Sequence, residues 1–142
     1  MIAYFDTSAI IPLLVDDEPG AEAVLAVWLS AESVVTARIL FAEAAAAIAR
    51  AARLGRLEPG ALDLALAGLD SVWSQLDIVD IDDSLVRTAG SLARTHSLRG
   101  YDAVHCAAAL RLADPTTVAL AGDQQLLAAW RTEGLQVVDT RA

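Results

Sequence analysis

The stretch MIAYFDTSAIIPLL, residues 1–14, places one aspartate and two hydroxyl side chains between two apolar segments. Residues 2–5 (IAYF) predict a buried β-strand, and Asp6 follows at the carboxyl end of that strand. A carboxylate in such surroundings costs several kcal/mol of folding free energy unless another group satisfies it. The sequence therefore predicts a partner for Asp6.

Short apolar segments alternate with longer helical ones along the rest of the chain. Further strands are predicted at residues 33–37, 77–81, 116–122 and 135–140, and helices at residues 19–31, 38–55, 58–76, 83–97, 101–113 and 123–134. This alternation is typical of an α/β fold in which helices flank a central, mostly parallel five-stranded sheet. The length of 142 residues fits one domain over residues 1–142 that folds without disulfides or structural metal.

The composition argues against several classes of protein. The one cysteine, Cys106, excludes an internal disulfide and argues against a cysteine-rich zinc site. The uninterrupted apolar runs are shorter than the roughly 18 residues that a membrane span needs, and the first residues lack the positive charge of a secretory signal. We therefore expect a cytoplasmic protein with no membrane contact.

The charged residues narrow the chemistry further. All ten basic residues are arginine, so a phosphate-binding loop of the Walker type and a Schiff-base lysine are both excluded. The net charge of −9 argues against nucleic-acid binding over the whole surface but allows a local arginine-lined groove. Arg50, Arg53 and Arg56 recur at three-residue spacing, a pattern that is also typical of a solvated helix face.

Four acidic residues have apolar neighbours. Asp6 and Asp123 follow predicted strands, and ligands of parallel sheets bind beyond the carboxyl ends of the strands. Glu43 lies in the apolar helix ILFAEAAAAIA, and Asp102 opens the segment YDAVHCAAAL. Taken singly, each of the three aspartates is better explained as a helix N-cap than as a metal ligand. Glu43 is not, because it lies inside a helix and has no basic residue four positions away on either side.

If these acids converge, their repulsion requires a cation in the same site. Carboxylate oxygens without histidine or thiolate ligands favour Mg²⁺ or Mn²⁺ over zinc. Such an ion polarises a phosphoryl oxygen and activates a water molecule. The matching reaction is hydrolysis of a phosphodiester.

Four segments together resemble the motifs of the PIN-domain family, and within it the VapC toxins of type II toxin/antitoxin pairs. They are YFDTSAIIPLL (residues 4–14), FAEAAAAIAR (41–50), LRGYDAVHCAAAL (98–110) and LAGDQQLL (120–127), in the order that the family shows. The resemblance covers essentially the whole chain. It implies an α/β/α sandwich with a Mg²⁺-dependent endoribonuclease site.

The resemblance also implies roles for individual residues. Asp6 and Asp102 are expected to be the principal metal ligands, Glu43 to orient metal-bound water, and Asp123 to act through water or a second ion. Ser8, or Thr7, is expected to fix Asp6. Many relatives carry a hydroxyl two positions before the fourth acid, where this chain has Ala121, so we expect Asp123→Asn to impair activity less than Asp6→Asn.

Two further residues are candidates for contact with a substrate, and three partners are expected. Arg99 is a candidate contact for RNA phosphate, or else an exposed loop arginine, and His105 is a candidate substrate contact, or else a packed or surface histidine. The resemblance implies a VapB-like antitoxin, an RNA substrate, and a homodimer formed through the early helices, for which residues 21–29 and 40–54 offer apolar surfaces.

Two alternatives keep the same fold. In the first, the protein binds and sequesters an antitoxin or RNA without catalysis. In the second, it is a metal-dependent phosphatase or a nuclease that acts on another substrate, which sensitivity to the 2′-hydroxyl would distinguish.

Overall fold

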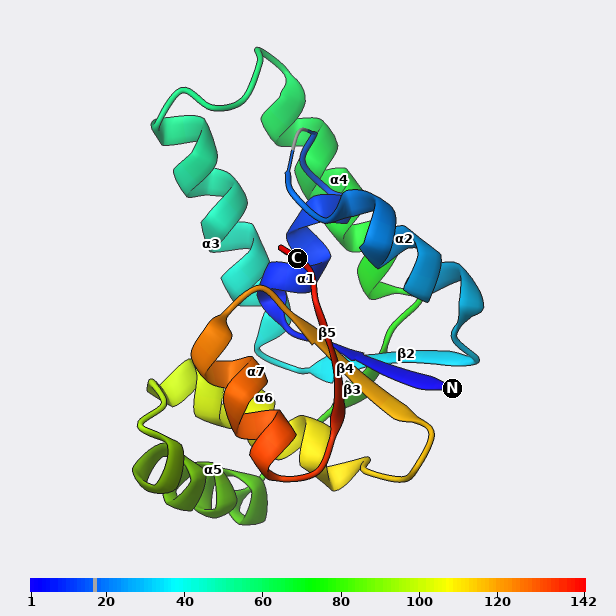
Figure 1. The fold of residues 1–142 in the computed structure, drawn as a ribbon. Coiled ribbons are helices and arrows are strands. Elements are labelled where there is room, and N and C mark those ends of the chain that lie inside the picture. The colour runs from blue at the N-terminus through cyan, green and yellow to red at the C-terminus, as the bar shows by residue number, and fades with distance from the viewer. Residues whose placement is uncertain (17) are drawn as a thin grey trace.

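Five parallel strands form the centre of the molecule in the computed structural model, which describes residues 1–16 and 18–142 (Figure 1). The strands are β1 (Ile2–Phe5), β2 (Ser33–Ala37), β3 (Asp77–Val79), β4 (Thr117–Ala121) and β5 (Gln136–Asp139), and their order in the sheet is β3-β2-β1-β4-β5. Every pairing in the sheet is parallel. The α/β fold with a five-stranded sheet, predicted from the alternation of segments, is therefore confirmed.

Helices occupy the connections between the strands. They are α1 (Thr7–Ile10), the 3₁₀ turn η1 (Ile11–Leu13), α2 (Ala21–Ser30), α3 (Leu40–Arg53), α4 (Ala61–Trp73), α5 (Asp83–His96), α6 (Gly100–Arg111) and α7 (Gln124–Thr132). No helix is predicted from the sequence for residues 7–13, where α1 and η1 lie. The helix predicted over residues 58–76 corresponds to α4, which begins at Ala61 because Gly60 adopts φ 84°.

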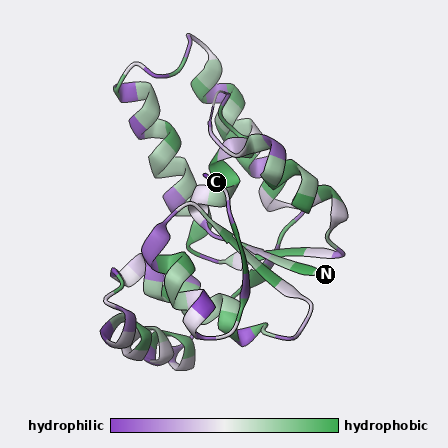
Figure 2. Ribbon diagram, viewed as in Figure 1, coloured by the Kyte–Doolittle hydropathy of each residue, from purple (hydrophilic) through white to green (hydrophobic). Residues whose placement is uncertain are grey.

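The side chains of each strand alternate between two apolar cores, one on each face of the sheet. Tyr4 and Val35 lie in the core that α5, α6 and α7 cover, whereas Ala3, Phe5 and Val34 lie in the core against α1 to α4. The α3–α4 hairpin extends away from the sheet (Figure 1). In Figure 2 hydrophobic residues follow the strands, and hydrophilic ones gather on α5 and at the far end of α3.

The fold bears on two features of the composition, the single cysteine and the apolar segments. Cys106 is fully buried in the α5–α7 core, and burial raises the pKa of its thiol to about 12, which fits a small packing residue. Within residues 1–16 and 18–142, no helix is long and apolar enough to cross a bilayer.

Candidate functional site

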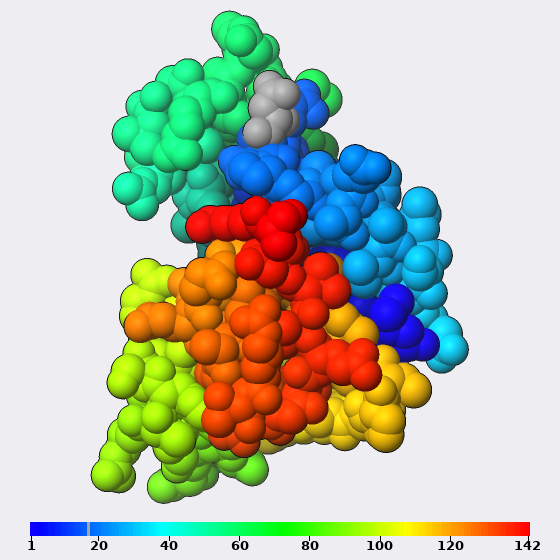
Figure 3. All heavy atoms as spheres, in the orientation of Figure 1, coloured from blue at the N-terminus to red at the C-terminus, as the bar shows by residue number. Residues whose placement is uncertain are grey.

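One polar pocket at the carboxyl edge of the sheet brings together every site residue expected from the sequence. It has a volume of about 220 Å³. It is lined by Asp6, Thr7, Ser8, Glu43, Arg99, Asp102, His105, Asp123 and Arg141. On the face seen in Figure 3, the surface is hollowed between α3 and the beginning of α7, two of the elements that border this pocket.

Asp6 is held at the junction of β1 and α1 and is only 4% exposed. Its Oδ1 accepts hydrogen bonds from Ser8 Oγ at 2.7 Å and from the Ala9 amide at 3.1 Å, so the carboxylate caps α1. Burial raises the pKa of Asp6 to about 6, although His105 and these hydrogen bonds favour the charged form, and Asp102 adds repulsion. Within the described ranges no hydrogen bond reaches Oδ2, which leaves that oxygen for a ligand.

The two hydroxyls that follow Asp6 have different partners. Ser8 Oγ donates to Asp6 and accepts a hydrogen bond from the Gly122 amide at 2.8 Å, so it joins the ends of β1 and β4. Thr7 Oγ1 instead donates to Glu43 Oε1 at 2.8 Å. The hydroxyl that fixes Asp6 is therefore Ser8, and Thr7 serves Glu43.

Glu43 projects from the first turn of α3 and is held by a histidine as well as by Thr7. His105 Nε2 lies 2.7 Å from Glu43 Oε1, and His105 Nδ1 lies 2.7 Å from the hydroxyl of Tyr4. Burial raises the pKa of Glu43, but the hydrogen bonds from His105 and Thr7, and the positive charge that His105 carries when it is protonated, outweigh it, so the pKa lies below its usual range. The His105 side chain is only 2% exposed. Its direct partners are thus protein side chains rather than the substrate contact suggested by the sequence.

Asp102 and Asp123 share one arginine. Arg99 Nε donates to Asp102 Oδ2 at 3.0 Å, and Arg99 Nη2 lies 3.7 Å from Asp123 Oδ2. These two carboxylates raise the pKa of the Arg99 guanidinium, whose side chain is 76% exposed. In this structure Arg99 therefore offsets part of the negative charge of two acids at the mouth of the pocket.

The helix-cap alternative fits two of the three aspartates. Asp6 caps α1, and Asp123 Oδ1 accepts a hydrogen bond from the Leu126 amide at 2.9 Å and caps α7. Asp102 lies inside the first turn of α6, whose N-cap is Arg99. Capping therefore does not explain Asp102, and for Asp6 it leaves the second oxygen unused.

Tyr4 and Arg141 contribute to the site although no sequence pattern indicated them. The Tyr4 hydroxyl bonds His105 from a position 101 residues away in the chain. Arg141 reaches the pocket because β5 pairs with β4 and the Thr140 amide continues that pairing to Ala121. Neither contact has a local signal in the sequence, because both depend on the order of the strands.

The donor set of the pocket fits a hydrated hard cation. Among residues 1–16 and 18–142, no three acidic, histidine or cysteine side chains are grouped closely enough to hold a metal ion by themselves. Mg²⁺ keeps several of its waters and is commonly bound through one or two carboxylates, so a ready-made protein cage is not required. The unbonded oxygen of the buried Asp6, close to the charge of Asp102, suits such binding.

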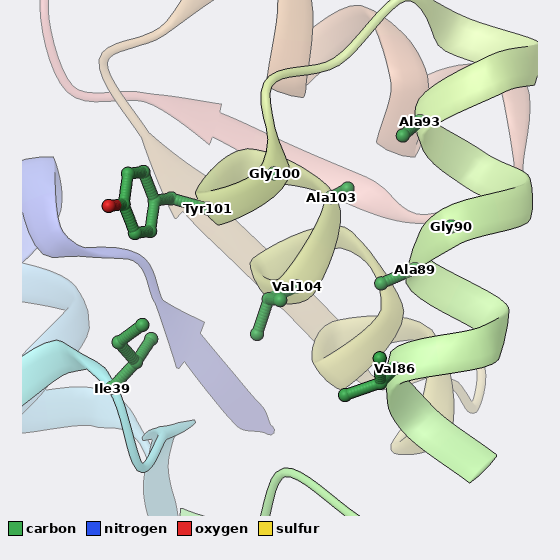
Figure 4. Close-up of a pocket in the computed structure, with 9 residues that line it drawn as sticks. All are labelled: Ile39, Val86, Ala89, Gly90, Ala93, Gly100, Tyr101, Ala103 and Val104. Atoms are coloured by element: carbon green, nitrogen blue, oxygen red, sulfur yellow. The ribbon is translucent and has the colours of Figure 1, made fainter. Parts of the chain in front are cut away.

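Two of the larger hollows outside the acidic pocket differ in the side chains that line them. The first is an apolar hollow of about 390 Å³ between α5 and α6, shown in Figure 4. Its lining includes Ile39, Val86, Tyr101 and Val104, but no charged residue. The second, of about 470 Å³, lies beside α3 and is lined in part by the three arginines Arg50, Arg53 and Arg56.

Comparison with known families gives a match across most of the chain. The model of the PIN domain family matches residues 3–130. The chain belongs to the PIN-domain family. This assignment agrees with the four motifs recognised in the sequence and with the parallel sheet described above.

Individual PIN-domain proteins resemble this one over nearly its full length. Ribonuclease VapC45 of Mycobacterium tuberculosis (strain CDC 1551 / Oshkosh) is 35% identical over 136 residues, which make up 96% of this chain and 94% of that protein. The structure of the Mycobacterium tuberculosis toxin VapC20, described as cleaving the sarcin-ricin loop, has a TM-score of 0.70 at 17% identity and covers 89% of this chain and 94% of its own. A toxin-antitoxin complex from Klebsiella pneumoniae has a TM-score of 0.66 at 18% identity, with 97% of each chain covered.

Proposed function

We propose that this PIN domain, spanning residues 1–142, is the toxin of a type II toxin/antitoxin pair and a Mg²⁺-dependent endoribonuclease. The observation that carries the proposal is the convergence of the four acids of the PIN motifs on one pocket. The 35% identity to a ribonuclease over 96% of the chain supports RNA as the substrate. Since that substrate is cytoplasmic, we expect the protein to act in the cytoplasm.

The four acids have different roles, which follow from their surroundings. Asp6 and Asp102 would hold Mg²⁺, and Asp123 would bind through water or hold a second ion; Mn²⁺ has the same preference for oxygen ligands. The ion would supply positive charge to the phosphoryl group and favour ionisation of a bound water. Glu43, whose pKa is lowered, remains an acceptor that orients the attacking water.

We propose protein partners of two kinds, an antitoxin and a second copy of this chain. An acidic pocket with a buried carboxylate is best covered by a basic side chain, so we propose that a VapB-like antitoxin inserts one there. The Klebsiella pneumoniae toxin-antitoxin complex shares this fold, which supports a hetero-oligomer. We also expect two copies of the toxin to pair, because apolar side chains such as Leu25, Leu29, Val86 and Tyr101 are exposed.

Cleavage of mixed cellular RNA by purified, antitoxin-free protein tests the proposal. We expect cleavage with Mg²⁺ or Mn²⁺ and none with EDTA, a loss of about 100-fold in Asp6→Asn, and a smaller loss in Asp123→Asn. Asp70→Asn, exposed on α4, is the matched control and should cleave normally. The neighbouring gene's product should suppress the activity.

The alternatives give different results in the same experiment. A folded protein that binds RNA or its neighbour but cleaves nothing, with or without metal, would indicate a sequestering protein. Equal cleavage of 2′-deoxy and ribose oligonucleotides would indicate a nuclease without RNA preference.

A further inference from the structure

Three side chains from different elements form a buried hydrogen-bonded chain behind the acidic pocket. Tyr4 lies on β1 and is 0% exposed, and His105 lies on α6 with a side chain 2% exposed. Tyr4 OH to His105 Nδ1 and His105 Nε2 to Glu43 Oε1 are both 2.7 Å. Thr7 Oγ1 also reaches Glu43 Oε1 and lies 3.3 Å from His105 Nε2. The chain thus ends on a carboxylate of the pocket.

The chemistry of these groups determines where the protons lie. An ionised carboxylate can only accept hydrogen bonds, so the short contact to Glu43 requires a hydrogen on His105 Nε2. In a neutral imidazole the other nitrogen, Nδ1, is then an acceptor, and the Tyr4 hydroxyl must donate to it. Every contact in the chain is satisfied by this one arrangement.

We propose that Tyr4 and His105 are positioning residues, which fix the Glu43 carboxylate for catalysis through the Nε2–H tautomer of His105. This inference rests on the proposed nuclease function. Both hydrogen bonds converge on Glu43 Oε1, and none reaches Oε2 among the described residues, so Oε2 is free to face a water molecule in the pocket. Tyr4 acts through His105, because its hydroxyl donates to Nδ1 and so holds the ring in the orientation in which Nε2–H donates to Glu43.

Stability alone does not account for this arrangement. A buried polar chain gains little net free energy over well-packed apolar side chains, since each group first loses its hydrogen bonds to water. What such a chain gives is a fixed orientation at its end. Here that end is Glu43, whose side chain is 22% exposed and so reaches the solvent of the pocket.

The nitrogen spectrum of the imidazoles tests the tautomer directly. The chain has only two histidines, so long-range ¹H–¹⁵N correlations resolve each ring. Near pH 8 we expect His105 of the wild type to carry its proton on Nε2, and Tyr4→Phe to keep that tautomer but to shift the ¹⁵Nδ1 resonance toward that of an acceptor without a hydrogen bond. A wild-type ring protonated on Nδ1, alone or together with Nε2, would overturn the proposal.

Activity tests the consequence for Glu43. Tyr4→Phe removes one hydroxyl, and we expect kcat to fall about 10-fold with KM unchanged. His105→Gln keeps an N–H donor and should retain more activity than His105→Leu, which has none. Trp130→Phe is the control, because Trp130 packs against Tyr4 at 5.9 Å between ring centroids but lies outside the hydrogen-bonded chain. It should lower stability and leave kcat unchanged.

The outcomes separate this inference from the proposed function. If Tyr4→Phe keeps the kcat of Trp130→Phe, or if Gln and Leu at position 105 are equally active, the positioning role is overturned. If the wild type itself cleaves no RNA, the proposed function fails. The spectra then still decide the hydrogen-bonded chain: an Nε2–H tautomer in the wild type whose Nδ1 resonance shifts in Tyr4→Phe supports it, and an Nδ1 resonance that does not change overturns it.

Discussion

Burial in the folded protein disfavours the charged form of Asp6. Its pKa is about 6 in the folded protein, compared with 3.8 for an ordinary aspartate, and burial is the main cause. Because folding raises this pKa, the contribution of Asp6 to stability is complete below about pH 4 and is lost as the pH rises through about 6. At neutral pH the metal-free protein therefore carries a buried charge that costs free energy.

Replacing Asp6 by asparagine should remove that cost. Asparagine keeps an oxygen that accepts from Ser8 and Ala9, so we expect Asp6→Asn to stabilise the metal-free protein near pH 8 by on the order of 2 kcal/mol. Near pH 4 the difference should vanish. Urea unfolding in EDTA at both pH values measures it, with Asp70→Asn as an unaffected control. A variant less stable than the wild type near pH 8 would contradict the expectation.

At the residue scale, the sequence predicts the members of the site better than their contacts. The convergence of Asp6 and Asp123 follows from parallel strands that end at one edge of the sheet. The partner of Glu43 could not be predicted from helix spacing, because His105 lies 62 residues from Glu43 in the chain and Tyr4 lies 101 residues from His105. Such contacts require the packing of α3, α6 and β1 to be known.

Helix α3 connects the acidic pocket to the arginines at its far end. Arg50 and Arg53 lie seven and ten positions after Glu43. This spacing places the three side chains on neighbouring parts of one helix face. Seven residues span about 10 Å along the axis. Among residues 1–16 and 18–142, no carboxylate forms an ion pair with Arg50, Arg53 or Arg56, so their charges are available to a phosphate chain.

Removal of two of these arginines should weaken RNA binding without affecting the pocket. In an inactive Asp6→Asn background, we expect Arg50→Ala with Arg53→Ala to lower RNA affinity about 10-fold and to reduce the salt dependence by about 1.4 in log–log slope. Fluorescence anisotropy at several salt concentrations measures both. Arg87→Ala with Arg94→Ala on α5 is the control. Loss of antitoxin binding with unchanged RNA affinity would assign this face to the antitoxin.

Strands and helices with a periodic sequence pattern could be predicted, whereas the four-residue helix α1 could not. The strands and the six longer helices follow from apolar alternation and from Gly and Pro at the joints. Helix α1 has four residues, too few for a periodic signal, and it depends on the Asp6 cap. Some predicted segment ends also differ from the observed ones. Residues 80 and 81, predicted as part of a strand, fall outside β3 because its pairing with β2 ends at Val79.

The whole molecule exposes apolar side chains in separate regions. Leu25 and Leu29 lie on α2, within one of the surfaces that the sequence suggested for a homodimer. Val86 and Tyr101, 49% and 62% exposed, border the hollow in Figure 4, which has no charged lining residue. Depletion of charge is typical of the centre of an interface, so the hollow is the stronger candidate for self-association.

We propose that two copies pair through this hollow, so a charge placed in it should separate them. We expect Val86→Glu to reduce the mass measured by light scattering from dimer to monomer, and Leu64→Glu, exposed on α4, to leave the dimer intact. If Leu29→Glu yields a monomer and Val86→Glu does not, the homodimer runs through the early helices instead.

The bridge that Arg99 makes between Asp102 and Asp123 changes what metal binding would mean for this protein. The pocket already holds a counterion of its own, tethered to the chain. Entry of Mg²⁺ would be an exchange of one cation for another, so the gain in local positive charge would be smaller than two. Arg99 would be released by the same event, and because its side chain is 76% exposed, the displaced guanidinium would be free to meet the phosphate that follows.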